Sequence, residues 1–125
     1  MYGSIEESTV WAEWSHATGG GVAPVDDPRW LCVFDGDLQV LDLRRPAVLA
    51  ALDVTVEELT AAWAPGSPNL ACLKVAAAAA AAGAHAMIVP SAARAEAWNI
   101  DIMPVGFAGL RRRSRRRRIP DPPAA

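Results

Sequence analysis

A run of eight small apolar residues, Val75–Ala82, ends at Gly83 and restricts the possible folds more than any other part of the sequence. Alanine is the strongest helix former, and Asn69 and Gly83 are suited to cap the two ends of such a helix. Because alanine buries little area, this helix must pack closely against a flat partner. The run is far too short to span a membrane. The sequence therefore predicts an alanine-rich helix packed on a β-sheet.

Three further helices are predicted from their start signals. Ser4–Glu7 reads as a capping box that opens a helix to about Thr18. Arg45-Pro46 starts a short helix to about Leu52, because proline suits the first helical turn. Thr55–Glu58 is a second capping box, and its helix runs through Trp63.

Four segments are predicted as strands. Trp30–Phe34 and Leu38–Leu43 flank Asp35-Gly36-Asp37, a pattern typical of a β-hairpin. Ala86–Val89 reads as a short buried strand before Pro90, and Asn99–Met103 is a fourth candidate. Helices and strands in this order predict an α+β fold, with a mixed or antiparallel sheet and flanking helices.

The charge is distributed unevenly over the 125 residues, a length that fits one domain. Residues 1–110 carry five basic and thirteen acidic side chains, which argues against a nucleic-acid-binding fold. Residues 111–125 carry seven arginines and only Asp121, and they end in a proline-containing segment. We expect 111–125 to be a disordered tail. Arg111–Arg118 could bind nucleic acid or an acidic partner, although no aromatic residues for base stacking lie among the arginines.

Cys32 and Cys72 lie in apolar surroundings without a CxxC pattern or a neighbouring histidine, so two buried, reduced thiols are expected. The two histidines are far apart, and no metal site is expected. The N-terminus has no signal-peptide pattern, and no segment is long enough to span a membrane. The expectation is a cytoplasmic protein.

Three residues stand out for their chemistry. Glu13 lies between Trp11 and Trp14, and a carboxylate beside apolar surface can stabilise a developing cation. Ser91 follows a predicted strand, and Tyr2 stands at the start of the chain. Their ordinary interpretations are an exposed helix-edge glutamate, a turn residue and a frayed aromatic residue. Composition and spacing alone do not decide between these alternatives.

The order of motifs resembles a known family. Residues 2–13, followed by Trp14-Ser-His, resemble the middle of a RES domain, a family named for its Arg, Glu and Ser residues. Residues 71–102 strengthen the resemblance through an Ala/Gly-rich helix, Met87-Ile-Val-Pro-Ser91 and Asn99-Ile-Asp-Ile-Met-Pro104. RES domains are typically the toxins of bacterial toxin–antitoxin pairs. Their fold is similar to that of ADP-ribosyltransferases, and they consume NAD.

The resemblance implies roles for individual residues. Glu13 would stabilise the oxocarbenium-like charge that develops when the nicotinamide–ribose bond breaks. Tyr2 would line the nicotinamide pocket, and Ser91 would hydrogen-bond the nucleotide or orient Glu13. Asn99 also matches a family position, with a structural role expected. NAD would be the substrate, no metal would be needed, and a cognate antitoxin would be the protein partner.

The resemblance is incomplete at the start of the chain. The family's arginines, expected to grip the NAD diphosphate, lie upstream of the tyrosine that matches Tyr2. We therefore expect residues 1–110 to be the C-terminal portion of a RES domain, N-terminally truncated and without that grip. The alternative is a non-catalytic binding protein that uses its arginine-rich tail.

Overall fold

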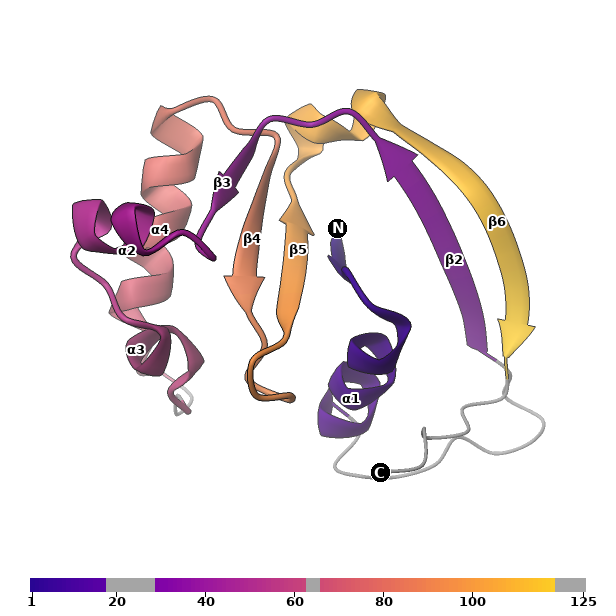
Figure 1. The fold of residues 1–125 in the computed structure, drawn as a ribbon, viewed down its shortest axis with the longest axis horizontal. Coiled ribbons are helices and arrows are strands. Elements are labelled where there is room, and N and C mark those ends of the chain that lie inside the picture. Colours follow the sequence, from indigo (N-terminus) through magenta and orange to yellow (C-terminus); the bar gives the residue numbers. More distant parts are fainter. Residues whose placement is uncertain (18–28, 63–65, 119–125) are drawn as a thin grey trace.

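The computed structural model describes residues 1–17, 29–62 and 66–118. Its main element is a four-stranded sheet in the order β1-β5-β4-β3 (Figure 1). The strands are β1 (Tyr2–Ser4), β5 (Trp98–Ile102), β4 (Ala86–Pro90) and β3 (Val40–Asp42). β3 and β4 are parallel and the other pairs are antiparallel. The α+β class with a mixed sheet is thus confirmed.

Three helices connect β3 to β4, since parallel neighbours need a long crossover. They are α2 (Pro46–Leu52), α3 (Val56–Thr60) and α4 (Leu70–Ala81). The core they form with the sheet contains Leu43, Val75, Ala79 and Met87. Ala79 has no exposed surface, so the small side chains of α4 allow the close approach to the sheet that the sequence predicted.

The start signals at Thr55 and Asn69 and the stop signal at Gly83 are confirmed, whereas the helix predicted to run through Trp63 ends at Thr60. The Thr55 hydroxyl accepts the amide of Glu58 at 3.1 Å, and the Glu58 carboxylate accepts the amide of Thr55 at 3.2 Å. Asn69 caps α4 by accepting the amide of Cys72 at 3.1 Å. Gly83 follows α4 with φ of 68°, the left-handed conformation that glycine adopts without strain.

The predicted capping box at Ser4 is wrong. Ser4 belongs to β1 and pairs with Asn99 of β5, and its hydroxyl donates to Asn99 Oδ1 at 2.5 Å. Helix α1 (Glu7–Ala17) begins later, and the carbonyl of Glu6 accepts its first backbone hydrogen bonds. The serine hydroxyl therefore stabilises the sheet instead of the helix N-terminus. The end expected at Thr18 lies outside the described residues.

The predicted hairpin is wrong, and residues 111–118 of the expected tail form a strand, for one shared reason. β2 (Arg29–Gly36) pairs with β6 (Leu110–Arg118) in a separate antiparallel ribbon, whereas β3 pairs with β4. Residues 111–118 are thus a strand, and residues 119–125 lie outside the described part of the chain. Ladder hydrogen bonds come from the backbone, so an arginine run forms a strand wherever a partner strand of suitable register is present. Such a distant partner leaves no local sequence signal.

A short 3₁₀ helix, η1 (Pro104–Gly109), joins β5 to β6. It packs directly on the backbone before β4, where a Cβ atom on Gly106 would lie 2.6 Å from the carbonyl oxygen of His85. Only glycine permits this approach. The contact positions the β2–β6 ribbon relative to the main sheet.

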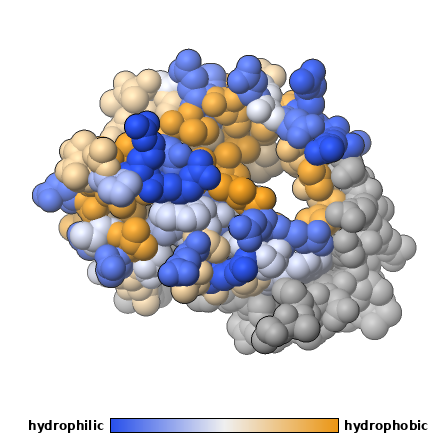
Figure 2. All heavy atoms as spheres, in the orientation of Figure 1, coloured by the Kyte–Doolittle hydropathy of each residue, from blue (hydrophilic) through white to orange (hydrophobic). Residues whose placement is uncertain are grey.

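The ribbon arches away from the sheet and leaves a hollow of about 650 Å³. Val10 of α1, Leu31 of β2 and Ile100 and Ile102 of β5 are among its lining residues. Figure 2 shows hydrophobic residues around this opening.

Both cysteines are exposed, which corrects the expectation of buried thiols. Cys32 lies on the narrow ribbon and Cys72 near the start of α4. An apolar sequence environment does not bury a side chain where too few elements pack over it. None of the helices in the described part of the chain is long and apolar enough to cross a membrane.

Candidate active site

Glu13, in the second half of α1, is held by side chains from the central strands. Its Oε1 atom accepts a hydrogen bond from the hydroxyl of Ser91 at 2.7 Å and another from the amide Nδ2 of Asn99. Within the described residues no hydrogen bond reaches Oε2. One carboxylate oxygen is therefore held by two donors, and none of the described side chains donates to the other.

Ser91 follows β4 directly and is only 5% exposed. Its oxygen accepts the backbone amides of Ala93 and Arg94 at 3.2 and 3.1 Å, and its proton goes to Glu13. Ser91 thus occupies a turn, as its ordinary interpretation expected, and it also donates a hydrogen bond to Glu13. Its roles toward a nucleotide and in catalysis stay predictions. Because the lone pairs are occupied by amides, the hydroxyl can serve Glu13 only as a donor.

Asn99 is fully buried on β5, and its two ends have different partners. Oδ1 accepts from Ser4 of β1, and Nδ2 donates to Glu13 of α1. The amide therefore links the sheet edge to the helix that carries the carboxylate. Sequence reasoning expected a structural role for Asn99 and missed this contact. A lone asparagine in an apolar strand was the available signal, since a buried amide requires hydrogen-bond partners.

Arg94, in the loop between β4 and β5, fixes the other end of α1. Its Nη1 atom donates to Glu6 at 3.2 Å, to the hydroxyl of Ser8, and to the hydroxyl of Thr9 at 3.1 Å. Thr9 has no exposed surface, so this contact is partly buried although Arg94 itself is exposed. The orientation of Glu13 thus depends on contacts at both ends of its helix.

Glu13 also lines a pocket of about 400 Å³ on the sheet face that α4 covers. This volume falls within the range of about 300–1,000 Å³ typical of small-molecule sites. α4 contributes Leu73 and Val75, and β4 contributes Met87 and Val89. The pocket therefore has apolar walls beside an anchored carboxylate.

Asp101 supplies a second carboxylate to this pocket. It follows Asn99 by two residues on β5, so both side chains emerge on the same face of the sheet. Tyr2 of β1 is the register partner of Asp101, which places the Tyr2 backbone at the same edge. The Tyr2 side chain lies outside the described part, so its predicted role stays a prediction.

Cys72 also lines the pocket, and its thiol donates to the carbonyl of Leu59 at 3.5 Å. Partial burial raises the pKa of the Cys72 thiol above its usual range. Cys72 is therefore mainly protonated at neutral pH. Among the described residues, no group of three His, Cys, Asp or Glu side chains is arranged to hold a metal ion.

These observations define a small α+β domain with a glutamate anchored by serine and asparagine at a ligand-sized pocket. The sequence model of the RES domain matches residues 1–121, nearly the whole chain. The protein therefore belongs to the RES domain family, as the resemblance indicated. No curated protein and no solved structure matches the chain significantly. The matched region extends past residue 110 and includes β6, where the expected domain boundary at 110 had placed a tail.

Proposed function

We propose that this chain acts on NAD at the nicotinamide–ribose bond, with Glu13 as the catalytic carboxylate. The observation that carries the proposal is the fixed orientation of Glu13. Ser91 and Asn99 bind one carboxylate oxygen, and the side chain lines a pocket of about 400 Å³. Membership of the RES family makes NAD the first substrate to test.

The reaction requires charge stabilisation more than proton transfer. When the bond breaks, its electron pair goes to the pyridinium nitrogen, and neutral nicotinamide leaves. The positive charge moves to the ribose C1′ and ring oxygen, and a nearby carboxylate stabilises it. A water, phosphate or protein nucleophile then bonds to C1′, and water would lose one proton. Glu13 needs no reorganisation in this step because its two donors already orient it.

The side chains that line the pocket are suited to the nicotinamide and ribose part of NAD. Leu73, Val75 and Val89 offer apolar contact to a nicotinamide ring. The carboxylate of Asp101 is suited to accept hydrogen bonds from ribose hydroxyls. By the family resemblance, Tyr2 would stack on the nicotinamide.

No basic side chain of the described residues lines this pocket. The NAD diphosphate therefore gains no ion pair from these residues, and the proposal predicts weak, millimolar affinity for NAD. Such affinity would still permit turnover at high substrate concentration, since Glu13 acts on the transition state.

Two further proposals depend on family membership. We propose that the chain is of the toxin type and has an antitoxin protein as its partner, as is typical of RES domains. NAD is a cytoplasmic metabolite, so the proposed activity belongs in the cytoplasm.

The test is to incubate the purified chain with millimolar NAD, with and without phosphate, and to identify the products by chromatography. We expect nicotinamide release, with the second product identifying water or phosphate as the nucleophile. Glu13→Gln should lower the rate about 10²- to 10³-fold, the usual effect of removing one charge-stabilising group. Glu57→Gln, an exposed glutamate on α3, is the matched control and should leave the rate unchanged. The proposal fails if the wild-type chain releases no nicotinamide, or if Glu13→Gln matches it.

A further inference from the structure

Strand β6 lies at the outer edge of the molecule. It pairs with β2 in a two-stranded ribbon, and within the described residues no third strand joins it. Figure 1 shows the ribbon bowed away from the main sheet, with β6 on the outside. In an antiparallel pair, about every second residue directs its N–H and C=O groups away from the partner. The outer edge of β6 therefore presents backbone donors and acceptors.

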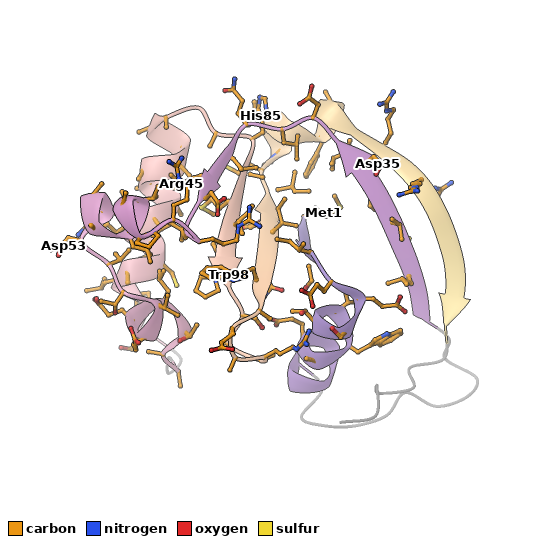
Figure 3. All side chains as sticks on the ribbon, viewed as in Figure 1. Met1, Asp35, Arg45, Asp53, His85 and Trp98 are labelled. Atoms are coloured by element: carbon orange, nitrogen blue, oxygen red, sulfur yellow. The ribbon has the colours of Figure 1, made fainter. Side chains whose placement is uncertain are left out.

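The same strand carries an unusual density of positive charge. Residues 111–118 include seven arginines, along about 27 Å at the usual rise per residue. The side chains of Arg111, Arg112 and Arg113 are exposed. Asp35, near the C-terminal end of β2 (Figure 3), lies 3.9 Å from Arg113, and both side chains are mostly exposed. Within the described side chains, this solvent-exposed pair contributes little and does not neutralise the charge of the run.

A strand edge and a cationic run together select among partners. Like charges directly opposite one another destabilise strand pairing, so β6 resists pairing with a second copy of itself. An extended acidic segment would instead place negative charges opposite the arginines. Its backbone can continue the ladder, and its carboxylates can pair with the arginines on both faces.

We propose that β6 accepts an acidic, extended peptide segment of a partner protein as a third strand of the β2–β6 ribbon. This site is separate from the Glu13 pocket, because residues of β2 and β6 do not line that pocket. The proposal is therefore independent of NAD chemistry.

Nucleic acid fits the observations less well. Residues 110–118 contain no aromatic side chain on which a base could stack. A phosphate backbone also cannot satisfy the outward N–H and C=O groups in the regular spacing of a ladder.

The experiment measures binding of a labelled nine-residue peptide of alternating glutamate and threonine or valine to the purified full chain. Fluorescence anisotropy reports affinity, and hydrogen exchange reports protection of the backbone. We expect saturable binding and slower exchange in residues 110–118. A peptide of identical charge, N-methylated at alternate amides, should bind at least about tenfold more weakly, because it cannot extend the ladder.

Variants of the chain provide a second test. Arg111→Glu with Arg113→Glu should weaken the unmodified peptide at least about tenfold, since two attractive pairs become repulsive. Arg45→Glu, an exposed arginine at the start of α2, is the matched control and should bind normally. Three results would each overturn the proposal: absent peptide binding, equal affinity for the N-methylated peptide, or tighter binding of a short DNA duplex that displaces the peptide.

Discussion

The hydrogen bond from Ser91 to Glu13 should be measurable as a coupling energy. The relevant set is Ser91→Ala, Glu13→Ala and the double variant. Ser91 is nearly buried, and its hydroxyl lies 2.7 Å from the carboxylate oxygen. Hydrogen bonds to charged groups contribute about 1.5–3 kcal/mol to stability. Glu13 is only half-buried, so water replaces part of the lost contact, and we expect a coupling of about 1–2 kcal/mol.

Ser91→Ala alone also frees two backbone amides, those of Ala93 and Arg94. Arg94 is exposed, so its amide can bind water, and the cost of this loss should be small. We expect Ser91→Ala to lower the free energy of unfolding by about 2 kcal/mol. The double-variant cycle removes this shared cost and isolates the pair.

Urea unfolding followed by circular dichroism measures all four proteins at one pH and salt concentration. The slopes with denaturant should agree across the set, because the same surface is exposed on unfolding. A coupling below about 0.5 kcal/mol, the additivity found for independent sites, would refute the reasoning. Glu13 would then owe its position to helix packing, and Ser91 would act only as a turn residue.

Three further predictions follow from the fold. Millimolar NAD should protect Cys72, which lines the candidate pocket, from alkylation, but it should not protect Cys32. The alkylation rate of Cys72 should rise with pH through its raised pKa. Equal protection of both thiols, read by mass spectrometry, would contradict the pocket assignment. Gly106→Ala should destabilise the protein by about 1–3 kcal/mol in thermal unfolding, because the added methyl group meets the carbonyl of His85, and an unchanged melting temperature would exclude that contact. The hydrogen-bonded guanidinium of Arg44 holds the pKa of Asp42 in the folded protein below its usual range. The pair therefore stabilises the folded state at pH values above the unfolded-state pKa of Asp42, and this stability is lost as pH falls through the folded-state pKa. Asp42→Asn should therefore cost about 0.5 kcal/mol at pH 7 for this exposed pair and nothing in acid, and a cost that persists in acid would show another cause.

Elements with strong local signals were predictable from the sequence. The Thr55 capping box, the Asn69 cap and the left-handed Gly83 depend on contacts within a few residues, so their patterns predict their structures. Ala86–Val89 was predicted as a strand because its apolar run is bounded by turn residues.

Elements whose partners lie far along the chain were not predictable. Ser4 has the sequence of a helix cap, yet its hydroxyl is used by a residue 95 positions away. The hairpin signal at Asp35–Asp37 was overridden because β2 finds its partner in residues 110–118. In both cases the local propensity is worth little beside the hydrogen bonds of a complete ladder.

In the candidate site, too, the sequence indicated the residues but not their contacts. The family resemblance singled out Glu13 and Ser91, 78 positions apart, but nothing local shows that their atoms meet. The buried amide of Asn99 joins them through β5. Burial of Thr9 and Arg94's contacts with α1 fix the helix that carries the carboxylate.

The sequence by itself determined the helix-rich crossover, its caps, the two central strands and membership of the RES family. The crossover, the caps and the strands follow from backbone preferences and from hydrogen bonds within a few residues, whereas family membership follows from the order of the motifs. The tertiary structure alone decided the strand order, the conversion of the arginine run into β6, and the two donors on Glu13. Each of these depends on pairing residues tens of positions apart, where the choice of partner is made by the packing of the whole core.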